Sequence, residues 1–583
     1  MKIAIIDGYV DEPACLGVPP FLSPYPRYLA GSLIKGGIED PVYITIDQIR
    51  DLLRGEPQQH QKQTTLSNLK EIDVFFILAG VSVPGKYIGG HPINLNDIRN
   101  LYELFNNTTR VLFGPSTDFG LGIEGGKPPL DISVIEPYVH FIVHGDAHFT
   151  IDHFISNRDL NLKTMIKQAD GKHIFFNCND SIEERMEKLS EFAKQGARII
   201  PQHPNYGKNL ICEIETYKGC PRYRTGGCSF CTETQKGSTT FRQKNHIIDE
   251  IKELAKFGCT HIRLGNQTDF YAYMHGEYEH ERYPKPNPSI IKSLLREIRE
   301  QAPNLQTLHI DNVNALNFAL YEPEAIEITK AIVQYCTDGN TAAIGIESVD
   351  PDVIKKNNLK VNQEEAMKAI QIINNYGAEH GPNGSPKYLP GLNFILGLPS
   401  ETPQSLQLNR TFLLKMLEKG LLVRRINIRK IMAPKSRVFS KELSKNAKLY
   451  DKWKEEIRQN IDYPMLKLCF PFGTVLKSCY FEYSQGNGSY LRQAGTYPIL
   501  IYCPELLSAE KTHNIVVLDH GFRSLVGMSF PVDLFSLSMK QLETIPGIGK
   551  NTATKIKLLQ KDDKEGLKSL IGAELYKHLT GNN

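Results

Sequence analysis

Residues 215–231 read Glu215-Thr-Tyr-Lys-Gly-Cys220-Pro-Arg-Tyr-Arg-Thr-Gly-Gly-Cys228-Ser-Phe-Cys231, and they carry the strongest signal in the chain. The three cysteines form the pattern C-x7-C-x2-C and follow an apolar, β-branched run at 210–215. Iron–sulfur clusters are held by cysteine thiolates, and three thiolates leave one iron of a four-iron cluster open to a further ligand. The sequence therefore predicts a [4Fe–4S] site with Cys220, Cys228 and Cys231 as its metal ligands.

Six apolar runs, separated by helix-like segments, continue from this stretch. The runs are at 210–215, 261–264, 307–310, 342–346, 391–396 and 425–431, and helices are expected at 247–257, 290–301, 323–335 and 363–376. Continuous apolar runs that alternate with helices are typical of buried parallel strands. They predict a partial (β/α)6 barrel over 209–440, in which the cysteine loop follows the first strand, at the end where barrel enzymes build active sites.

Four segments resemble the radical S-adenosylmethionine (SAM) enzymes, in the order of that superfamily. The usual cysteine spacing there is C-x3-C-x2-C, so the first loop here has four extra residues. Residues 264–267 stand where a glycine-rich motif binds the SAM amino group, with Gln267 replacing the usual acidic residue. Residues 345–348 resemble the fourth-strand motif near the SAM ribose, and 391–402 resemble the fifth-strand motif whose backbone contacts adenine. The resemblance implies that the cofactor-binding residues are Gly265, Asn266, Gln267, Glu347, Ser348, Gly397, Leu398 and Pro399.

The resemblance also implies a reaction. The open iron would bind the amino and carboxylate groups of SAM, one electron would cleave the cofactor, and a 5′-deoxyadenosyl radical would abstract hydrogen from a substrate. The cofactor carries the difficult chemistry in such enzymes, and the protein positions and shields it. The sequence identifies neither the electron donor nor the group added, which could be methyl, methylthio or another, and it names no catalytic residue for the substrate step.

A second interpretation of the cysteines stays open. Cys212 precedes Cys220 by eight residues and could complete a four-cysteine zinc site, which would make the chain a non-catalytic zinc-containing nucleic-acid-binding protein. Free cysteines are often buried, so Cys212 is itself expected in the core. Cys15, in a Pro/Gly-rich loop, is a candidate exposed thiol.

Residues 1–150 predict a doubly wound α/β domain, with strands at 2–6, 41–46, 73–78, 110–113 and 141–143. This placement resembles the cobalamin-dependent radical SAM enzymes and the methylthiotransferases. The chain has no D-x-H-x-x-G motif, so cobalamin is open but unsupported, and only Cys15 precedes residue 178, which disfavours a second cluster. The Pro-rich segment 15–27 is expected to be a lid over the barrel mouth. A linker with one charged helix at 182–195 is expected over 151–208.

The C-terminal part predicts two further modules. Residues 441–535 suggest a helical connector and a small β-rich, OB-like domain, and 536–583 are helical. The segment 542–556 resembles a helix–hairpin–helix, whose glycines allow a tight turn with N–H groups facing a phosphate, and protein packing is its alternative role. The expected nucleic-acid-binding residues are Gly547, Gly549 and Lys550, and the β-rich domain adds stacking or cationic candidates, which could equally be core residues, at Tyr480, Phe481, Tyr483, Arg492 and Tyr497. As a whole the chain resembles the archaeal-type radical SAM proteins with a C-terminal helix–hairpin–helix.

Composition limits the remaining choices. The chain has 583 residues, 41% hydrophobic and 23% charged, as expected for a globular protein of several domains. The net charge of +3 means that any nucleic-acid surface is local. The N-terminus lacks the apolar segment of a signal peptide and no run of 18 apolar residues occurs, so we expect a cytoplasmic protein with no membrane partner. The favoured substrate is a nucleic acid, such as tRNA or another structured RNA; a small molecule or a peptide is the alternative.

Overall fold

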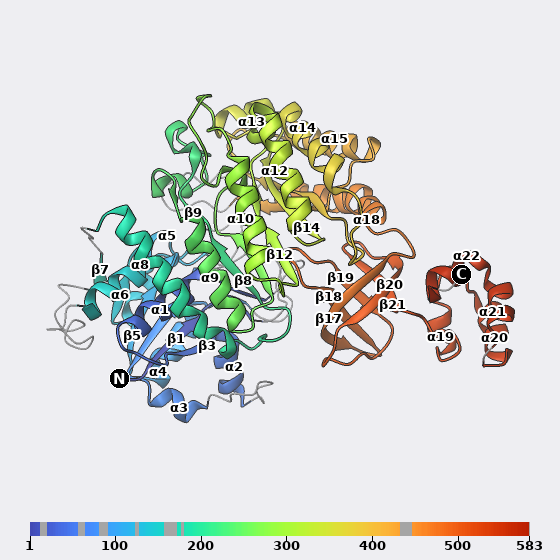
Figure 1. Ribbon diagram of the computed structural model, residues 1–583, viewed down its shortest axis with the longest axis horizontal. Coiled ribbons are helices and arrows are strands. Elements are labelled where there is room, and N and C mark those ends of the chain that lie inside the picture. Colours follow the sequence, from blue (N-terminus) through green and yellow to red (C-terminus); the bar gives the residue numbers. More distant parts are fainter. Residues whose placement is uncertain are drawn as a thin grey trace.

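The computed structural model describes residues 1–11, 20–55, 65–80, 91–122, 128–156, 172–175, 180–431, 446–561 and 563–581. Figure 1 shows the N-terminal sheet and the C-terminal helices at opposite ends of the molecule, with a large and a small β-structure between them. No helix of the described residues is both long enough and apolar enough to cross a membrane.

The N-terminal domain is built on a six-stranded sheet in which all neighbouring strands are parallel. Its order is β3-β1-β4-β5-β6-β7, with β1 Ile3–Asp7, β3 Val42–Thr45, β4 Val74–Leu78, β5 Thr109–Phe113, β6 Phe141–Val143 and β7 His173–Ile174. The five strands expected from the sequence are all present, and β7 was not predicted because two residues are too short to form a pattern. The helices are α1 Pro24–Lys35, α2 Ile46–Arg54, α3 Leu66–Lys70, α4 Leu95–Leu104, α5 Ser116–Phe119 and α6 Ala147–Ser156.

Alternate residues of this sheet enter two different cores. In β1, Ala4 and Ile6 pack into a cluster formed with helices α2 and α4. Ile3 and Ile5 belong instead to the large core that continues into the second α/β unit. Both faces are therefore buried, which explains why the strands are apolar throughout rather than alternating with polar residues.

The second unit contains two four-stranded sheets, in the orders β12-β11-β8-β2 and β13-β14-β15-β16. The strands are β2 Phe21–Leu22, β8 Ile211–Glu215, β11 His261–Gly265, β12 Thr307–Ile310, β13 Asn312–Val313, β14 Asn340–Glu347, β15 Tyr388–Leu396 and β16 Arg425–Lys430. All six predicted barrel strands are found, and all pairings within these two sheets are parallel.

The lid that we expected over 15–27 is wrong for the part of it that the structure describes. Phe21 pairs with Ile211 and Leu22 with Cys212, so this segment is an edge strand of the barrel sheet, and α1 begins at Pro24. Residues 12–19, which include Cys15, lie outside the described residues.

A buried charge network joins α1 to the barrel. The guanidinium groups of Arg27 and Arg242 both contact the Glu250 carboxylate, Arg242 at 2.5 Å, and none of the three side chains is more than 2% exposed. Arg242 also donates to the Tyr28 hydroxyl at 2.9 Å. The N-terminal domain is thus attached to the barrel by paired charges as well as by apolar packing.

Helices cover the outer faces of the barrel sheets. In α10 the residues Ile291, Leu294, Leu295 and Ile298 are buried and follow the spacing of one helix face, while the opposite face is polar. The helices of this unit and of its connectors are α8 Ile182–Gln195, α9 Lys244–Lys256, α10 Pro288–Gln301, α11 Leu316–Leu320, α12 Glu322–Tyr335, α13 Pro351–Lys356, α14 Gln363–Gly377, α15 Pro403–Glu418, α17 Ala447–Ile457 and α18 Tyr463–Cys469.

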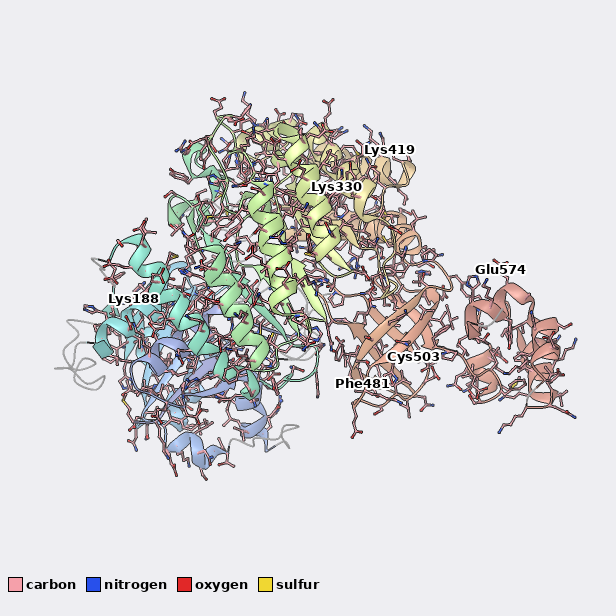
Figure 2. All side chains as sticks on the ribbon, viewed as in Figure 1. Lys188, Lys330, Lys419, Phe481, Cys503 and Glu574 are labelled. Atoms are coloured by element: carbon pink, nitrogen blue, oxygen red, sulfur yellow. The ribbon has the colours of Figure 1, made fainter. Side chains whose placement is uncertain are left out.

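The C-terminal β-rich unit is a closed five-stranded barrel in the order β17-β18-β19-β21-β20. Figure 2 marks it with the labels Phe481 and Cys503. Its strands are β17 Val475–Gln485, β18 Gly488–Gln493, β19 Leu500–Cys503, β20 His513–His520 and β21 Ser524–Ser529. Four helices follow, α19 Met539–Leu542, α20 Lys550–Leu558, α21 Lys564–Ile571 and α22 Ala573–Thr580, and they share an apolar core with β20 and β21.

Candidate functional site

The three predicted metal ligands lie on a loop that leaves the barrel after β8. Its base is a short antiparallel ribbon of β9 Tyr217–Lys218 and β10 Thr240–Phe241. At the base Gly219 has φ +85°, and a Cβ there would lie 2.7 Å from the carbonyl oxygen of Ser238. Only glycine fits this position, so it closes the ribbon directly before Cys220.

Asn358 holds the cysteine loop from the side of β14. Its side-chain amide donates to the carbonyl oxygens of Thr225 at 2.7 Å and Gly227 at 2.8 Å. Its own oxygen atoms accept from Arg222, whose other guanidinium nitrogen donates to Cys228 Sγ at 3.2 Å. The segment between Cys220 and Cys228 is therefore held by hydrogen bonds to the side chains of Arg222 and Asn358.

The neighbouring residue Asn357 connects the same loop to the end of β15. Its carbonyl and side-chain oxygens accept from Ser229, the latter at 2.8 Å, while its amide donates to the carbonyl of Pro399 at 2.9 Å. Leu398 and Cys228 belong to one small apolar cluster. The cysteine loop and the 397–399 segment, predicted to act together, are in direct contact.

One ammonium group faces all three cysteines. Lys360 interacts electrostatically with Cys228, Cys231 and Cys220, and also with Glu347. Burial alone would lower the pKa of Lys360, but its interactions with these acidic side chains raise it. Burial raises the pKa of Cys220 and raises that of Cys231 to about 11, against the effect of Lys360. A fixed positive charge beside buried thiols would offset the negative charge of bound thiolates.

The barrel strands end in left-handed residues near this loop. Asn266 has φ 56° after β11, Glu347 has φ 66° at the end of β14, and Ser400 has φ 68° after β15. Non-glycine residues seldom adopt this conformation, and it concentrates at functional sites. Three segments at or after the carboxyl ends of barrel strands share it here, each predicted to bind SAM or directly beside such a segment.

Glu347 is the most distinctive of the three. The register of β14 against β15 shifts between Gly345 and Glu347, which turns the carboxylate toward Lys360. A Cβ at Gly345 would lie 2.3 Å from Glu347 Oε1 and 2.7 Å from Lys360 Nζ, so the glycine makes room for both groups. Burial raises the pKa of Glu347 to about 7, and within the described residues its Oε2 atom has no hydrogen-bond partner.

Known proteins resemble the chain at this region and along its length. Residues 214–411 match the radical SAM superfamily model. An uncharacterized protein of Archaeoglobus fulgidus is 38% identical over 555 residues, which cover 94% of this chain and 93% of that protein. An uncharacterized protein of Methanocaldococcus jannaschii is 37% identical over 534 residues, 90% and 93% of the two chains. The chain belongs to the radical SAM superfamily.

Two solved structures of radical SAM enzymes are similar at low identity. One is the methyltransferase TsrM from Kitasatospora setae with cobalamin and a [4Fe–4S] cluster bound, with a TM-score of 0.45, 11% identity, and coverage of 74% of this chain and 72% of that one. The other is the cobalamin-dependent enzyme OxsB, with a TM-score of 0.46, 15% identity, and coverage of 78% and 56%.

Membership of this superfamily implies a [4Fe–4S] cluster and SAM, and the residues present fit both. Three thiols, a buried cation and a glycine-closed loop suit an anionic cluster. The orphaned Oε2 atom of Glu347 suits a ligand that donates hydrogen bonds, such as the hydroxyl groups of a ribose.

The zinc interpretation finds no support. Among the described residues, no three His, Cys, Asp or Glu side chains converge closely enough to hold a single metal ion. A zinc ion would bring all its sulfur ligands within about 2.3 Å of one atom, whereas a four-iron cluster binds each thiolate at a different iron atom. Cys212 is fully buried in β8, where its thiol contacts Cys259 rather than the cysteine loop.

The remaining predicted SAM residues lie at the same end of the barrel. Asn266 donates to the Glu215 carboxylate at 2.8 Å, and Gln267 Oε1 accepts from Thr216 at 3.3 Å, so both are tied to the base of the cysteine loop. Ser348 contacts Asn409 rather than the loop. The backbone N–H of Gly397 donates to Glu401 Oε1 at 2.9 Å. A carboxyl group, that of Glu215, therefore lies directly beside the segment expected to bind the SAM amino group.

A turn of the N-terminal domain contacts this site. Asp146, after β6, accepts from Lys218 Nζ at 2.5 Å, directly beside the cysteine loop. The loops in which a sheet of this strand order reverses direction, after β1 and β4, fall at 12–19 and 81–90, outside the described residues. Cobalamin binding therefore stays a prediction without a described ligand.

The aromatic and cationic candidates of the small barrel have different surroundings. Tyr480 contacts His261 and Gln306, Tyr497 donates to Asp311 at 2.8 Å, and Arg492 is buried beside Glu482. Of these candidates, Tyr483 belongs to a partly exposed row of aromatic rings, which it forms with Tyr490 and Tyr502. Neither Tyr490 nor Tyr502 was predicted. The turn with Gly547, Gly549 and Lys550 is exposed and leads into α20.

Several residues of the cysteine site were not predicted. The sequence patterns marked none of Asn357, Asn358 and Lys360. The sole local signal was a pair of asparagines after a short helix, because asparagine is the non-glycine residue most tolerant of the left-handed region, in which Asn358 has φ 47°.

Proposed function

We propose that this radical SAM enzyme modifies a nucleic acid, with structured RNA such as tRNA as the substrate class. In this proposal Cys220, Cys228 and Cys231 hold the cluster and Glu347 binds the ribose of SAM. When bound, these cofactors supply a 5′-deoxyadenosyl radical. The protein's own part is to hold the thiolates together, to offset their charge through Lys360 and to keep water away from the buried strand ends.

One observation carries the substrate class, a row of three tyrosines across the small barrel. Tyr483 pairs directly with Tyr490, and Tyr490 with Tyr502, on neighbouring strands. Their ring centroids are 4.6 Å apart at 15° and 5.2 Å apart at 49°, and all three rings are half-buried. A side chain at Gly488 would collide with the Tyr502 ring, so this glycine leaves room for it. Stacked aromatic rings on a small barrel are a typical platform for unpaired bases.

The strand order supports the same interpretation. The strands close in the order β17-β18-β19-β21-β20. β19 and β21, the third and fifth strands along the chain, pair in parallel, which is the arrangement of OB-like barrels. The row crosses the first three strands, and single-strand binding in that fold uses the face of the second and third. The exposed glycine turn at 547–549 would add a backbone-phosphate contact, as expected for a helix–hairpin–helix.

The positions of the two sites favour a large substrate. The small barrel docks at the amino-terminal ends of the large barrel's strands, since Tyr480 contacts His261, the first residue of β11. The cysteine loop lies at the opposite, carboxyl ends. β14 alone, with eight residues, spans roughly 26 Å between those ends. A ligand that touches both sites must be macromolecular, which favours a folded RNA over a small molecule or a short peptide.

Nucleoside analysis tests the proposal. Total tRNA and rRNA from a strain lacking this gene are digested and compared with wild type by mass spectrometry. We expect one modified nucleoside to disappear and to return with a wild-type copy but not with a Cys228→Ala copy. An unchanged nucleoside profile would remove nucleic acid as the substrate, whereas colourless, iron-free protein after anaerobic purification would remove the radical chemistry itself.

A further inference from the structure

A partly open pocket of about 60 Å³ lies where three parts of the chain meet, far from the cysteine loop. Its wall is formed by the start of β16, the connector helices before the small barrel, and two segments of the small barrel. The lining residues are Val423, Arg424, Arg425, Ile426, Asp462, Leu466, Tyr497, Pro498, Ile499, Leu500, Phe522 and Arg523. β16 begins at Arg425, so the pocket is at the amino end of the barrel strands, opposite the predicted cluster.

Aromatic rings hold two of its arginines in place. The Arg425 guanidinium lies 4.1 Å from the centre of the Tyr497 ring, and that of Arg424 lies 5.4 Å from Phe470. Arg424 also donates to the carbonyl of Tyr497 at 2.6 Å. Stacking orients a guanidinium group without neutralising its charge. Both cations are therefore preorganised at the pocket wall.

Basic side chains predominate in the described lining of the pocket. Arg424, Arg425 and Arg523 line it together with the carboxyl group of Asp462. Burial, together with the nearby Arg425 and Arg523, lowers the pKa of Arg424 to about 10, although Cys469 raises it. Arg424 is still charged at neutral pH, so three guanidinium cations converge at the pocket wall.

Local backbone irregularity brings Asp462 to the pocket. Residues Arg458–Asp462 form a π-helical turn between α17 and α18. Such turns are rare and often occur at functional sites, because they cost stability and shift side chains relative to a regular helix. Burial raises the pKa of Asp462 to about 6, against nearby arginines.

We propose that this pocket binds a phosphate group through Arg424, Arg425 and Arg523. Guanidinium groups match the oxygens of a phosphate as paired donors, and three of them lining one half-buried pocket favour a multiply charged anion. The site goes beyond the proposed function, because it lies apart from the cluster and its occupancy needs no radical chemistry.

Two sources could supply the phosphate, a free phosphate ester or the backbone of a nucleic acid. The pocket shares β19 with the tyrosine row, since Leu500 lines the pocket and Tyr502 lies two residues further on the same strand face. If a phosphate of an RNA backbone occupied the pocket, the bases of the next nucleotides would lie near the tyrosine row. A free phosphate ester would instead fix the small barrel against the large one.

Binding measurements on the full chain test the site with two probes, pyrophosphate and a fluorescent 12-nucleotide single-stranded RNA. We expect wild-type protein to bind pyrophosphate or the RNA, and Arg523→Gln to weaken that binding about tenfold. Asp462→Asn is expected to strengthen it, because it removes the competing negative charge. Arg296→Gln, an exposed arginine on α10, is the matched control and should change nothing.

The pattern of losses identifies the source. Loss of pyrophosphate binding alone in Arg523→Gln indicates a free phosphate ester, and loss of RNA affinity with a shallower salt dependence indicates a backbone phosphate. Wild-type protein that binds neither probe at millimolar concentration, or an Arg523→Gln variant that binds both as wild type does, overturns the proposal. Both measurements are made on apo protein, so failure of the proposed radical reaction would leave them unaffected.

Discussion

Asn358 Nδ2 donates a 2.8 Å hydrogen bond to the carbonyl oxygen of Gly227, the residue directly before Cys228. The two residues are 131 positions apart in the chain, so this bond closes the cysteine loop against the segment that follows β14. It also explains how the seven residues between Cys220 and Cys228 can be held in one conformation. The loop does not depend on a bound cluster alone for its shape.

Asn358→Gly should loosen the cysteine loop without straining the backbone. Asn358 has φ 47°, a conformation that glycine adopts freely, so the variant removes only the side-chain hydrogen bonds. Each bond is worth about 1 kcal/mol, and we expect reconstituted iron per chain to fall at least about twofold. Iron and sulfide analysis after anaerobic reconstitution measures this.

The control for this variant is Asn362→Ala, which removes the N-cap of α14 and its capping box. That change costs about 1 kcal/mol of stability but does not touch the cysteine loop. If both variants lose iron equally, general destabilisation rather than the Asn358 clamp sets cluster content.

Glu347→Gln should weaken SAM binding while leaving the fold intact. The Oε2 atom of Glu347 is buried without a partner in the described residues, and a charged acceptor bonds a ligand hydroxyl more strongly than an amide does. We expect the affinity for SAM to fall about tenfold, measured by anaerobic calorimetry. The variant should not unfold, because glutamine has the size and shape of glutamate and keeps a hydrogen-bond acceptor at the same position.

Glu379→Gln provides the comparison, since Glu379 is exposed and pairs with Lys387 on the surface. SAM affinity that is equal in Glu347→Gln and wild type would show that the carboxylate does not contact the cofactor.

The parallel strands of both α/β units could be predicted because burial on two faces leaves a continuous apolar run. The run at 391–396 lies within β15, which is Tyr388–Leu396, and the run at 141–143 is β6. β2 could not be found in this way. Phe21–Leu22 becomes a strand only because β8 offers an open edge, and a two-residue strand has no pattern of its own.

The candidate site was predictable where chemistry depends on residue type and not where it depends on tertiary contacts. Cysteine spacing is local, so the three thiols could be named. Lys360 and Asn358 reach the loop only after more than a hundred intervening residues have folded. In the small barrel a bulge between Phe481 and Tyr483 changes which side chains share a face. The sequence gives no sign of that bulge, so Tyr490 and Tyr502 were missed.

Tyr490→Ala should weaken RNA binding by the small barrel. Tyr490 is the central ring of the row and contacts both Tyr483 and Tyr502. Loss of one stacking platform costs about 1–3 kcal/mol per base, so fluorescence anisotropy with a 12-nucleotide RNA should show a fall of roughly fivefold or more. Tyr490→Phe keeps the ring and should bind nearly as wild type, and Tyr206→Ala, an exposed tyrosine outside the barrel, serves as the control. RNA affinity that survives Tyr490→Ala would exclude the row as a base-stacking surface.

Glu482 should make the stability of the protein depend on pH. Its side chain is 1% exposed, and burial raises its pKa from 4.5 to about 7 although Arg492 lies 3.6 Å away. Between those values the folded state binds more protons than the unfolded state, so the free energy of unfolding falls as pH rises from 4.5 to 7. The slope from this group is at most about 1.4 kcal/mol per pH unit, and it vanishes above pH 7.

Denaturant unfolding at several pH values compares Glu482→Gln with wild type. The variant should show a flatter dependence between pH 4.5 and 7, whatever its absolute stability, because the titrating group is gone. Glu510→Gln, on an exposed turn of the same barrel, should keep the wild-type slope. Parallel curves for Glu482→Gln and wild type would contradict the raised pKa.

Glu250→Gln should destabilise the junction between the N-terminal domain and the barrel. The Glu250 carboxylate contacts the guanidinium groups of both Arg27 and Arg242, and all three side chains are buried. Removing one partner of a buried charge network leaves the other charges without compensation, which costs about 3–5 kcal/mol. Glu297→Gln breaks a half-exposed pair with Lys244 on neighbouring helices and should cost less than about 1 kcal/mol. Equal midpoints of urea unfolding for these two variants would mean that apolar packing alone fixes α1 to the barrel, whereas an early transition confined to Glu250→Gln would show that the paired charges hold the two units together.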